Sequence, residues 1–217
     1  MDRLMRIARK AHTQVVWTPI IALTLGVAAA AESAADSQSQ DHFSPELLFE
    51  HGRCELTFDS GALFSPIGSP KKRPTINYTI TEVELGYMLG GVKGHGWWRG
   101  NFEVIADGFA SAIFEGPGTY TAGFTAWLRY NFVPSNWRVV PYAQAGAGLL
   151  STDIDRGIVG QPFNFNLNAG ASLRYFLSPR WSIELEYRYQ HISNANLGKK
   201  NVGINSQGPI LGVSYFF

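Results

Sequence analysis

The fold is decided by residues 163–177, which read FNFNLNAGASLRYFL, and by residues 181–191, which read WSIELEYRYQH. In both stretches, every second residue is apolar or small except for His191 at the end, and the positions between them are polar or glycine except for Phe176. Successive side chains of a β-strand point to opposite faces of the sheet. This alternation therefore predicts two strands, each with one apolar and one polar face. Residues 178–180, Ser-Pro-Arg, predict a tight turn between them.

Six further segments show a weaker form of the same alternation. They cover residues 54–64, 75–89, 99–114, 121–132, 137–150 and 209–217. Together with the first two stretches, they predict about eight strands. The phase of the alternation changes near Thr81, which predicts a β-bulge there. Trp127 is a second irregularity, because it falls on the otherwise polar face of its segment.

These strands predict an all-β fold, an eight-stranded antiparallel transmembrane β-barrel of the outer membrane. A membrane-spanning strand needs roughly 9–11 residues, and a membrane barrel turns its apolar faces to the lipid and keeps a polar interior. Charged residues lie on the polar faces and are expected to form an interior ion-pair network: Glu184, Glu186, Arg188, Arg174 and Arg129. Aromatic residues gather at the strand ends, as in interfacial girdles. The alternative is a soluble barrel or a lipocalin-like, lipid-binding cup in the periplasm.

The composition excludes several classes of protein. The chain has 217 residues, of which 45% are hydrophobic and 16% are charged, which fits neither a disordered chain nor a bundle of membrane helices. The formal net charge of +1 argues against a general nucleic-acid partner. The single cysteine, Cys54, rules out a disulfide framework and a cysteine-based zinc site. The histidines lack metal-ligand spacing, so we expect neither a metal nor another cofactor.

Residues 1–31 are expected to be a secretory signal peptide. They combine a basic start, a short apolar stretch and a run of alanines at residues 28–31. A permanent membrane anchor is the alternative, but Pro19 interrupts the stretch and a spanning helix needs roughly 20 apolar residues. Residues 32–45 are mostly polar and predict a flexible periplasmic lead-in. Residues 46–217 are then the barrel domain.

The lengths of the connections predict the orientation in the membrane. Residues 134–136 form a second tight turn, whereas residues 151–162 and 193–208 are long loops. Short periplasmic turns and long outer loops are typical of outer-membrane barrels. The strand at residues 181–191 therefore ends at the outer rim. Residues 90–98 are an exception, because they are longer than a tight turn at a predicted periplasmic position.

His191 and Ser193 are candidates for catalysis. If the strand continues past His191, both side chains lie on its apolar, lipid-facing side, where two polar groups are unusual. They are roughly 7 Å apart along the backbone, so their side chains can lean together. A general base beside a hydroxyl is the minimal arrangement that activates a nucleophile. The alternative is that both are ordinary residues of the membrane interface.

The sequence around these two residues resembles a known family. Residues 191–205 read HISNANLGKKNVGIN, and the chain ends in GVSYFF at residues 212–217. His-x-Ser-Asn-Ala, followed by Asn-x-Gly-Ile and a last strand that ends on an aromatic residue, is similar to the motif of lipid A 3-O-deacylases (PagL-type, or acyloxyacyl hydrolases). The preceding EYRYQ at residues 186–190 also resembles that family. The resemblance implies a multi-pass barrel of the Gram-negative cell outer membrane that hydrolyses the ester-linked 3-O-acyl chain of lipid A without a cofactor.

The resemblance also implies roles for individual residues. By position, His191 is the general base and Ser193 is the nucleophile of a serine ester hydrolase. Asn194 is expected to help form the oxyanion hole, whose donors stabilise the charge that develops in the transition state. Asn196 departs from the family pattern, which has Gly there, although Asn tolerates a left-handed backbone better than most residues.

A second departure bears on the activity itself. Asn205 aligns with the acidic member of the triad, and replacing the acid of a serine triad can cost about 10⁴ in rate. Asp153 and Asp155, in the preceding long loop, are alternative sources of a carboxylate. The alternative function is a catalytically inactive, structural or surface-interaction barrel of the outer membrane.

The expected partners follow from this reading. Lipid A, or lipopolysaccharide, in the outer leaflet is the expected substrate, and the protein itself is embedded in the membrane. Lys199 and Lys200 lie beside the site and are candidates for a phosphate or sugar contact. The acyl-chain preference and the oligomeric state stay open, with a homodimer as one alternative.

Overall fold

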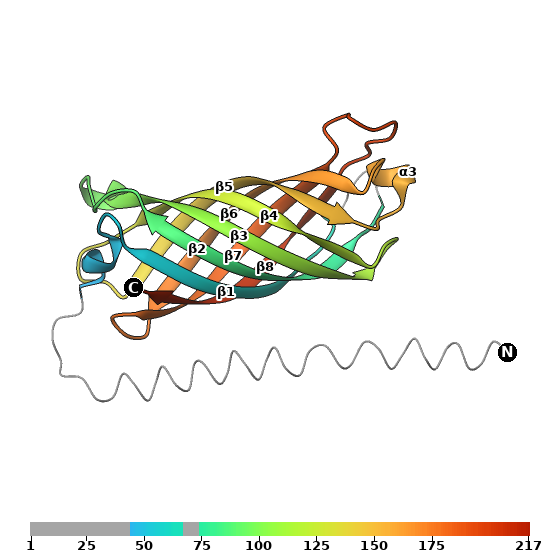
Figure 1. The fold of residues 1–217 in the computed structure, drawn as a ribbon. Helices are drawn as coiled ribbons and strands as arrows, with labels where there is room; N and C mark the ends of the chain where they lie inside the picture. Colours follow the sequence, from blue (N-terminus) through green and yellow to red (C-terminus); the bar gives the residue numbers. More distant parts are fainter. Residues whose placement is uncertain (1–43, 67–73) are drawn as a thin grey trace, which may run out of the picture. The chain divides into compact units, whose positions relative to one another are not determined.

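The computed structural model describes residues 44–66 and 74–217, which include eight strands that close into a barrel (Figure 1). The strands are β1 (Cys54–Leu63), β2 (Asn77–Met88), β3 (Gly100–Glu115), β4 (Tyr120–Phe132), β5 (Val139–Thr152), β6 (Phe163–Phe176), β7 (Trp181–Ser193) and β8 (Ile204–Phe216). Each strand pairs antiparallel with its neighbours in sequence, and β1 pairs with β8, so the sheet closes on itself. The predicted all-β barrel is thus confirmed.

The described residues include three short helices: η1 (Pro45–Phe49), which precedes β1, and η2 (Gly96–Trp98) and α3 (Arg156–Val159), which lie in connections between strands. Within the described residues, no helix is long and apolar enough to cross a membrane. The expected signal peptide, residues 1–31, lies outside the described residues. So does the expected lead-in, residues 32–45, apart from its last two residues.

The two ends of the barrel differ. The start of β1 and the end of β8 meet at one end, where the backbone N–H of Cys54 donates to the carbonyl oxygen of Phe217 (3.1 Å). The turns at residues 133–138 and 177–180 lie at this end, which we call the terminal end (Figure 1). The longer connections at residues 153–162 and 194–203 lie at the opposite end, which we call the loop end.

The predicted bulge near Thr81 is wrong. Thr81 pairs with Ser60 on one side and with Ala110 on the other, without a break in either ladder. The register shift in β2 lies instead between Asn77 and Tyr78. The apparent phase change in the sequence has another cause: the inward-facing residues change from apolar (Tyr78 and Ile80) to charged (Glu82 and Glu84) along the strand, while the pleat continues.

The start of β8 also differs from the prediction, because the strand begins at Ile204 rather than at Pro209. Proline lacks the backbone N–H that a central strand needs. A proline in a strand-like pattern therefore predicts that the strand begins at the proline. In the structure, Pro209 pairs with Tyr187 of β7. On its other side, continuous pairing with β1 ends at Ile210, so the missing N–H falls where the ladder is interrupted.

The interior consists of three layers. Buried apolar side chains fill the loop end and include Leu63, Tyr78, Ile80, Phe109, Leu150, Ile192 and Ile204. A second apolar cluster fills the terminal end: Phe49, Met88, Val133, Val140, Phe176 and Phe216. The middle layer is charged. This filling agrees with the expectation that about eight strands leave a lumen occupied by side chains rather than a pore.

The charged middle layer confirms the predicted ion-pair network. Arg129 contacts Glu55 (2.5 Å) and Glu84 (2.7 Å). Arg174 contacts Glu55 (2.8 Å) and Glu184 (2.9 Å). Arg188 contacts Glu186 (2.8 Å) and also Glu82. Trp127 belongs to this layer as well, since the Arg188 guanidinium lies 4.7 Å from its ring, which explains why an aromatic residue interrupts the polar, inward-facing side of β4.

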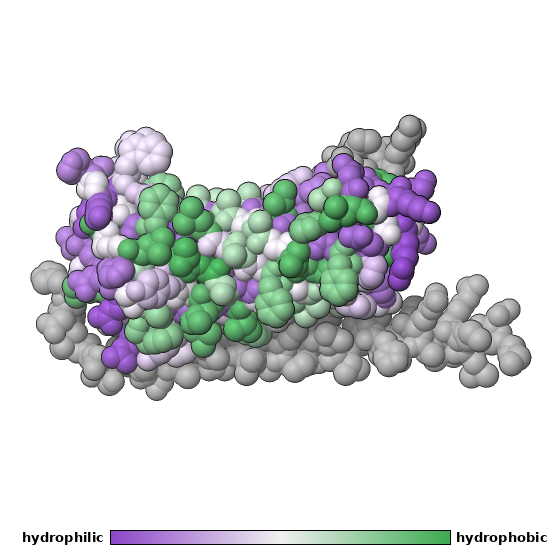
Figure 2. Space-filling model, turned by 45° about the horizontal axis from the view of Figure 1, so that its top comes forward, coloured by the Kyte–Doolittle hydropathy of each residue, from purple (hydrophilic) through white to green (hydrophobic). Residues whose placement is uncertain are grey.

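The outer surface carries the apolar halves of the strands. Figure 2 shows a band of hydrophobic side chains across the middle of the face in view, with hydrophilic side chains towards both ends. Leu173, Leu185 and Tyr187 are examples of the exposed, outward-facing positions of β6 and β7. A soluble barrel would bury such a surface, so the outer face is built to contact lipid.

Candidate active site

Strand β7 carries His191 and Ser193 to the rim of the loop end. The strand continues to Ser193, as the candidate site requires. Gln190 and Ile192 are buried, whereas His191 and Ser193 are only partly buried. The two side chains therefore lie on the outward, lipid-facing side of the sheet, two residues apart. At strand spacing, their backbone positions are roughly 7 Å apart.

Asn205 of β8 lies directly opposite His191 in the ladder. The Nδ1 atom of His191 is 2.6 Å from the Oδ1 atom of Asn205. Because a carbonyl oxygen can only accept, Nδ1 carries the proton and donates. The other ring nitrogen, Nε2, is then the one that can take up a proton. The acid of a serine triad fixes its histidine in this same tautomer.

Gly203 provides the space for the imidazole. It has a positive φ of 72°, which favours glycine. A Cβ atom at this position would lie 3.1 Å from Cε1 of His191 and 3.8 Å from Nε2. The glycine of the Asn-x-Gly-Ile element therefore leaves room beside the ring edge that carries Nε2.

Asn194 connects the loop at residues 194–203 to the loop that contains α3. Its side-chain Nδ2 donates to the carbonyl oxygens of Val159 (2.9 Å) and Lys200 (2.6 Å). Its backbone N–H donates to Oδ1 of Asn201 (3.2 Å). The side chain is fully buried. Both hydrogens of its amide are thus engaged in building the loop, and neither points freely towards an approaching oxyanion.

The two residues after Asn194 turn the chain sharply. Ala195 and Asn196 both have positive φ angles, 52° and 63°. Asn196 thus adopts the left-handed conformation for which Gly is the usual residue. The side-chain amide of Asn201 donates to Oδ1 of Asn196 (2.9 Å), which helps to hold the turn. The replacement of the family's Gly is therefore compatible with this loop.

The two alternative carboxylates are engaged elsewhere. Asp153 accepts hydrogen bonds from the backbone N–H (2.8 Å) and hydroxyl (2.5 Å) of Thr119 and from the backbone N–H of Tyr120 (3.0 Å). Burial acts to raise the pKa of Asp153, but these hydrogen bonds outweigh it and lower the pKa below its ordinary value. Asp155 caps α3 by accepting from the N–H of Gly157 (2.5 Å). Asn205, rather than either aspartate, faces Nδ1 of His191.

The rim around these residues is basic. Lys199 and Lys200 are exposed on the loop between β7 and β8. Arg156 is exposed on α3, and the backbone N–H of Val202 donates to the carbonyl oxygen of Ile158 (2.9 Å), so the two loops are in contact. Sequence reasoning missed the contributions of Gly203 and of α3. A positive φ at the glycine was foreseeable from its residue type, but nothing in the sequence indicates the contact with α3.

The family model of lipid A 3-O-deacylases (PagL) matches residues 81–214. A comparison with curated proteins finds no match. Among solved structures, the outer-membrane enzyme PagL superposes with a TM-score of 0.51 at 18% sequence identity, covering 73% of this chain and 98% of that chain. Neisserial surface protein A superposes with a TM-score of 0.51 at 17% identity, covering 76% and 97%. These likenesses show the fold, which is that of small outer-membrane β-barrels.

Proposed function

The chain belongs to the lipid A 3-O-deacylase (PagL) family, and from this premise we propose that it hydrolyses the ester-linked 3-O-acyl chain of lipid A. The observation that carries the mechanism is the 2.6 Å contact between Nδ1 of His191 and Oδ1 of Asn205, on the same outward face as Ser193. Lipid A lies in the outer leaflet, so its acyl chains approach the barrel from the side on which these residues lie.

In the proposed mechanism, Ser193 is the nucleophile and His191 is the general base. Nε2 of His191 takes the hydroxyl proton as Oγ of Ser193 attacks the ester carbonyl carbon. The tetrahedral intermediate collapses, the sugar oxygen leaves with the proton from His191, and an acyl-enzyme remains. Water then attacks the acyl-enzyme with His191 again as the base, which releases the fatty acid. Asn205 holds the tautomer and orientation of His191 but adds no negative charge.

Asn194 contributes to oxyanion stabilisation in this proposal by fixing the loop. Its amide holds the carbonyls of Val159 and Lys200, and so sets the turn at Ala195 and Asn196. Successive backbone N–H groups in a tight turn form an anion-binding concavity. We assign the hydrogen-bond donors of the oxyanion hole to the backbone amides of this turn. Lys199 and Lys200 would attract the lipid A phosphates.

The test is mass spectrometry of lipid A from Gram-negative cells that express the wild type, Ser193→Ala or Ser182→Ala. Ser182 is the matched control, since it lies on the same strand but is buried inside the barrel. We expect the wild type and Ser182→Ala to remove one hydroxyacyl mass, and Ser193→Ala to remove none. Unchanged lipid A with folded wild-type barrel in the outer membrane would contradict the proposal.

A structural or surface-interaction barrel without activity is the second candidate function. The uncharged Asn205 beside His191 favours it, because an acid normally stabilises the imidazolium that forms during catalysis. This candidate predicts unchanged lipid A with the wild type and with both serine variants.

A further inference from the structure

The interior of the barrel holds far more acid than base. Among the described residues, eight carboxyl side chains and three guanidiniums there are no more than 3% exposed: Glu55, Asp59, Glu82, Glu84, Glu103, Asp107, Glu184 and Glu186, with Arg129, Arg174 and Arg188. Eight negative against three positive charges leave a net charge of −5 if every group is ionised. Apolar clusters close both ends of this layer. Because an uncompensated buried ion costs several kcal/mol, protons or bound cations must supply the missing positive charge.

The deficit of positive charge is concentrated at two aspartates. The six glutamates share the three arginines in ion pairs. Within residues 44–66 and 74–217, Asp59 and Asp107 form no ion pair, and Oδ2 of Asp59 has no hydrogen-bond partner. Oε1 of Glu84 also lacks a hydrogen bond there, and the guanidinium of Arg188 is 3.7 Å away from it.

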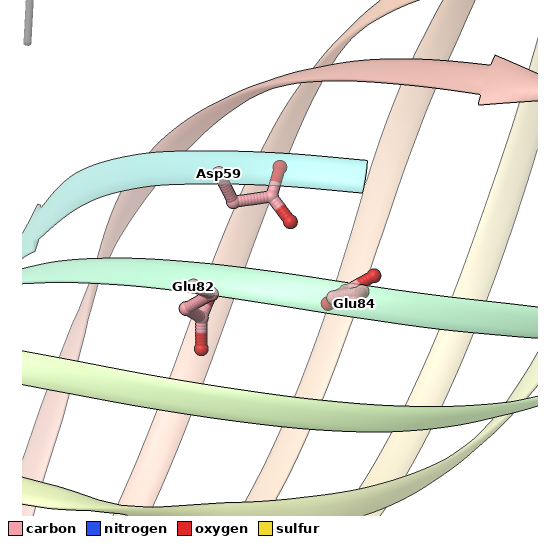
Figure 3. A group of neighbouring side chains, drawn as sticks. All are labelled: Asp59, Glu82 and Glu84. Carbon is pink, nitrogen blue, oxygen red and sulfur yellow. The ribbon is translucent and has the colours of Figure 1, made fainter. Parts of the chain in front are cut away.

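Asp59, Glu82 and Glu84 bring their carboxylates together. Asp59 of β1 is the direct cross-strand partner of Glu82 of β2, and Glu84 follows on the same inner face of β2. One oxygen from each of the three residues lies within 4.8 Å of the others. Figure 3 shows Asp59 on β1 beside Glu82 and Glu84 on β2, with one carboxylate oxygen of Asp59 turned to the side of β2. Ca²⁺ takes oxygen ligands at roughly 2.3–2.6 Å, so one ion can contact oxygens that far apart.

Asp107 provides an independent indication of a ligand at this place. It lies on β3 directly opposite Glu84, and it is 2% exposed. Its Oδ2 accepts from Nε1 of Trp127 (3.2 Å), but its Oδ1 has no partner in the described part of the chain. A fourth buried carboxylate with an unpartnered oxygen thus borders the same group.

We propose that Asp59, Glu82 and Glu84 bind a divalent cation inside the barrel, with Ca²⁺ as the preferred ion. Carboxylate oxygens suit hard cations of this kind. Arg188 pairs with Glu82, and Arg129 pairs with Glu84 but shares its charge with Glu55, so the three carboxylates keep an excess of at least one negative charge that a cation would balance. The ion is enclosed when the barrel closes, and its role is structural. The site lies in the charged middle layer of the interior, and it is separate from the rim that carries His191 and Ser193.

The experiment uses the barrel refolded from urea into detergent, without lipopolysaccharide, in the presence of CaCl₂ or EGTA. Metal content after desalting is measured by inductively coupled plasma mass spectrometry, and unfolding by the heat-induced shift in gel migration. We expect one Ca²⁺ per wild-type chain and a higher unfolding temperature with CaCl₂ than with EGTA. Asp59→Asn should weaken Ca²⁺ binding by at least about tenfold, in the range typical for loss of a supporting group at a metal site.

Glu103→Gln is the control variant, because it removes the same charge from the same interior but lies outside the three residues. It should bind Ca²⁺ as the wild type does. A wild-type barrel without Ca²⁺ and with the same unfolding temperature in both buffers would overturn the proposal and show that protons neutralise the interior. Equal loss of Ca²⁺ in Asp59→Asn and Glu103→Gln, or full retention in Asp59→Asn, would also overturn it.

Discussion

Ser182 and Ser193 lie on the same strand, β7, but on opposite faces of the barrel wall. Ser182 faces inwards near the terminal end, is fully buried, and its hydroxyl has no hydrogen-bond partner among the described residues. Ser193 faces outwards at the loop end, two residues from His191. The alternation of the strand thus decides which hydroxyl a membrane lipid can reach. Inner-face groups stabilise the closed sheet, and outer-face groups at the rim are available for chemistry.

The same division holds for the charged groups of β7. Arg188 is fully buried and held by Glu82 and Glu186, whereas His191, three residues later, is partly exposed and paired with a neutral amide. We therefore expect substitutions of inner-face residues to change stability and substitutions at the rim to change activity. The following variants test that division, from the largest expected effect to the smallest.

Arg188→Met should lower the free energy of unfolding by about 3–5 kcal/mol, the usual cost of removing one partner of a buried ion pair. The substitution leaves the carboxylates of Glu82 and Glu186 without their guanidinium inside the barrel. Urea unfolding followed by tryptophan fluorescence measures this loss. The refolded fraction should keep its activity per folded molecule. A stable barrel with lost activity would contradict the division between interior and rim.

Asn205→Asp should raise the rate of deacylation by at least about tenfold, because an acid in this place of a serine triad is worth up to about 10⁴. The substitution keeps the position of the oxygen that faces Nδ1 of His191. The assay is fatty-acid release from lipopolysaccharide in detergent. Asn201→Asp, in the loop that precedes β8, is the control and should not accelerate the reaction. A rate equal to or below that of the wild type would contradict the claim that the missing negative charge at Asn205 slows catalysis by His191.

Gly203→Ala should reduce activity more than stability. A Cβ atom would lie 3.1 Å from Cε1 of His191, and the positive φ of 72° adds strain of about 1 kcal/mol. The imidazole must shift, and a misplaced base slows proton transfer. Gly90→Ala is a suitable control, because a Cβ there has open space. Unchanged activity in Gly203→Ala would show that the ring does not depend on this glycine.

Asp153→Asn should have the smallest effect, a slight loss of stability with no change in activity. The hydrogen bonds from Thr119 and Tyr120 lower the pKa of Asp153 in the folded state. Its contribution is therefore present above the pKa of the unfolded chain, about 3.9, and is lost as the pH falls through the lower, folded-state pKa. Thermal unfolding of both proteins at neutral and strongly acidic pH should show a difference that disappears in acid. A loss of activity would instead place Asp153 in the site.

The sequence predicts the strands and their two faces well, because a period of two needs only local information. The ion-pair network around Arg129, Arg174 and Arg188 follows directly from that pattern. The apparent phase change at Thr81 misleads, because alternation does not distinguish a bulge from a change in the filling of the interior. The start of β8 was missed because Pro209 is tolerated where the ladder to β1 is interrupted.

The candidate site was predictable in its residues but not in its geometry. His191, Ser193 and Asn205 stand in the motif, and cross-strand register places His191 against Asn205. The engagement of Asn194 by carbonyls of two loops depends on α3, which comes from a distant part of the chain. The convergence of Asp59, Glu82 and Glu84 likewise depends on the pairing of β1 with β2.

The most direct test of the division along β7 is covalent labelling with a fluorophosphonate, which reacts with activated serine hydroxyls. The folded barrel is treated in detergent, digested, and the modified residue is identified by peptide mass spectrometry. We expect the label on Ser193 in the wild type, none on Ser182, and no label in His191→Ala, since the base is required to activate the hydroxyl. An unlabelled wild-type barrel, or equal labelling of Ser193 with and without His191, would contradict the proposed nucleophile.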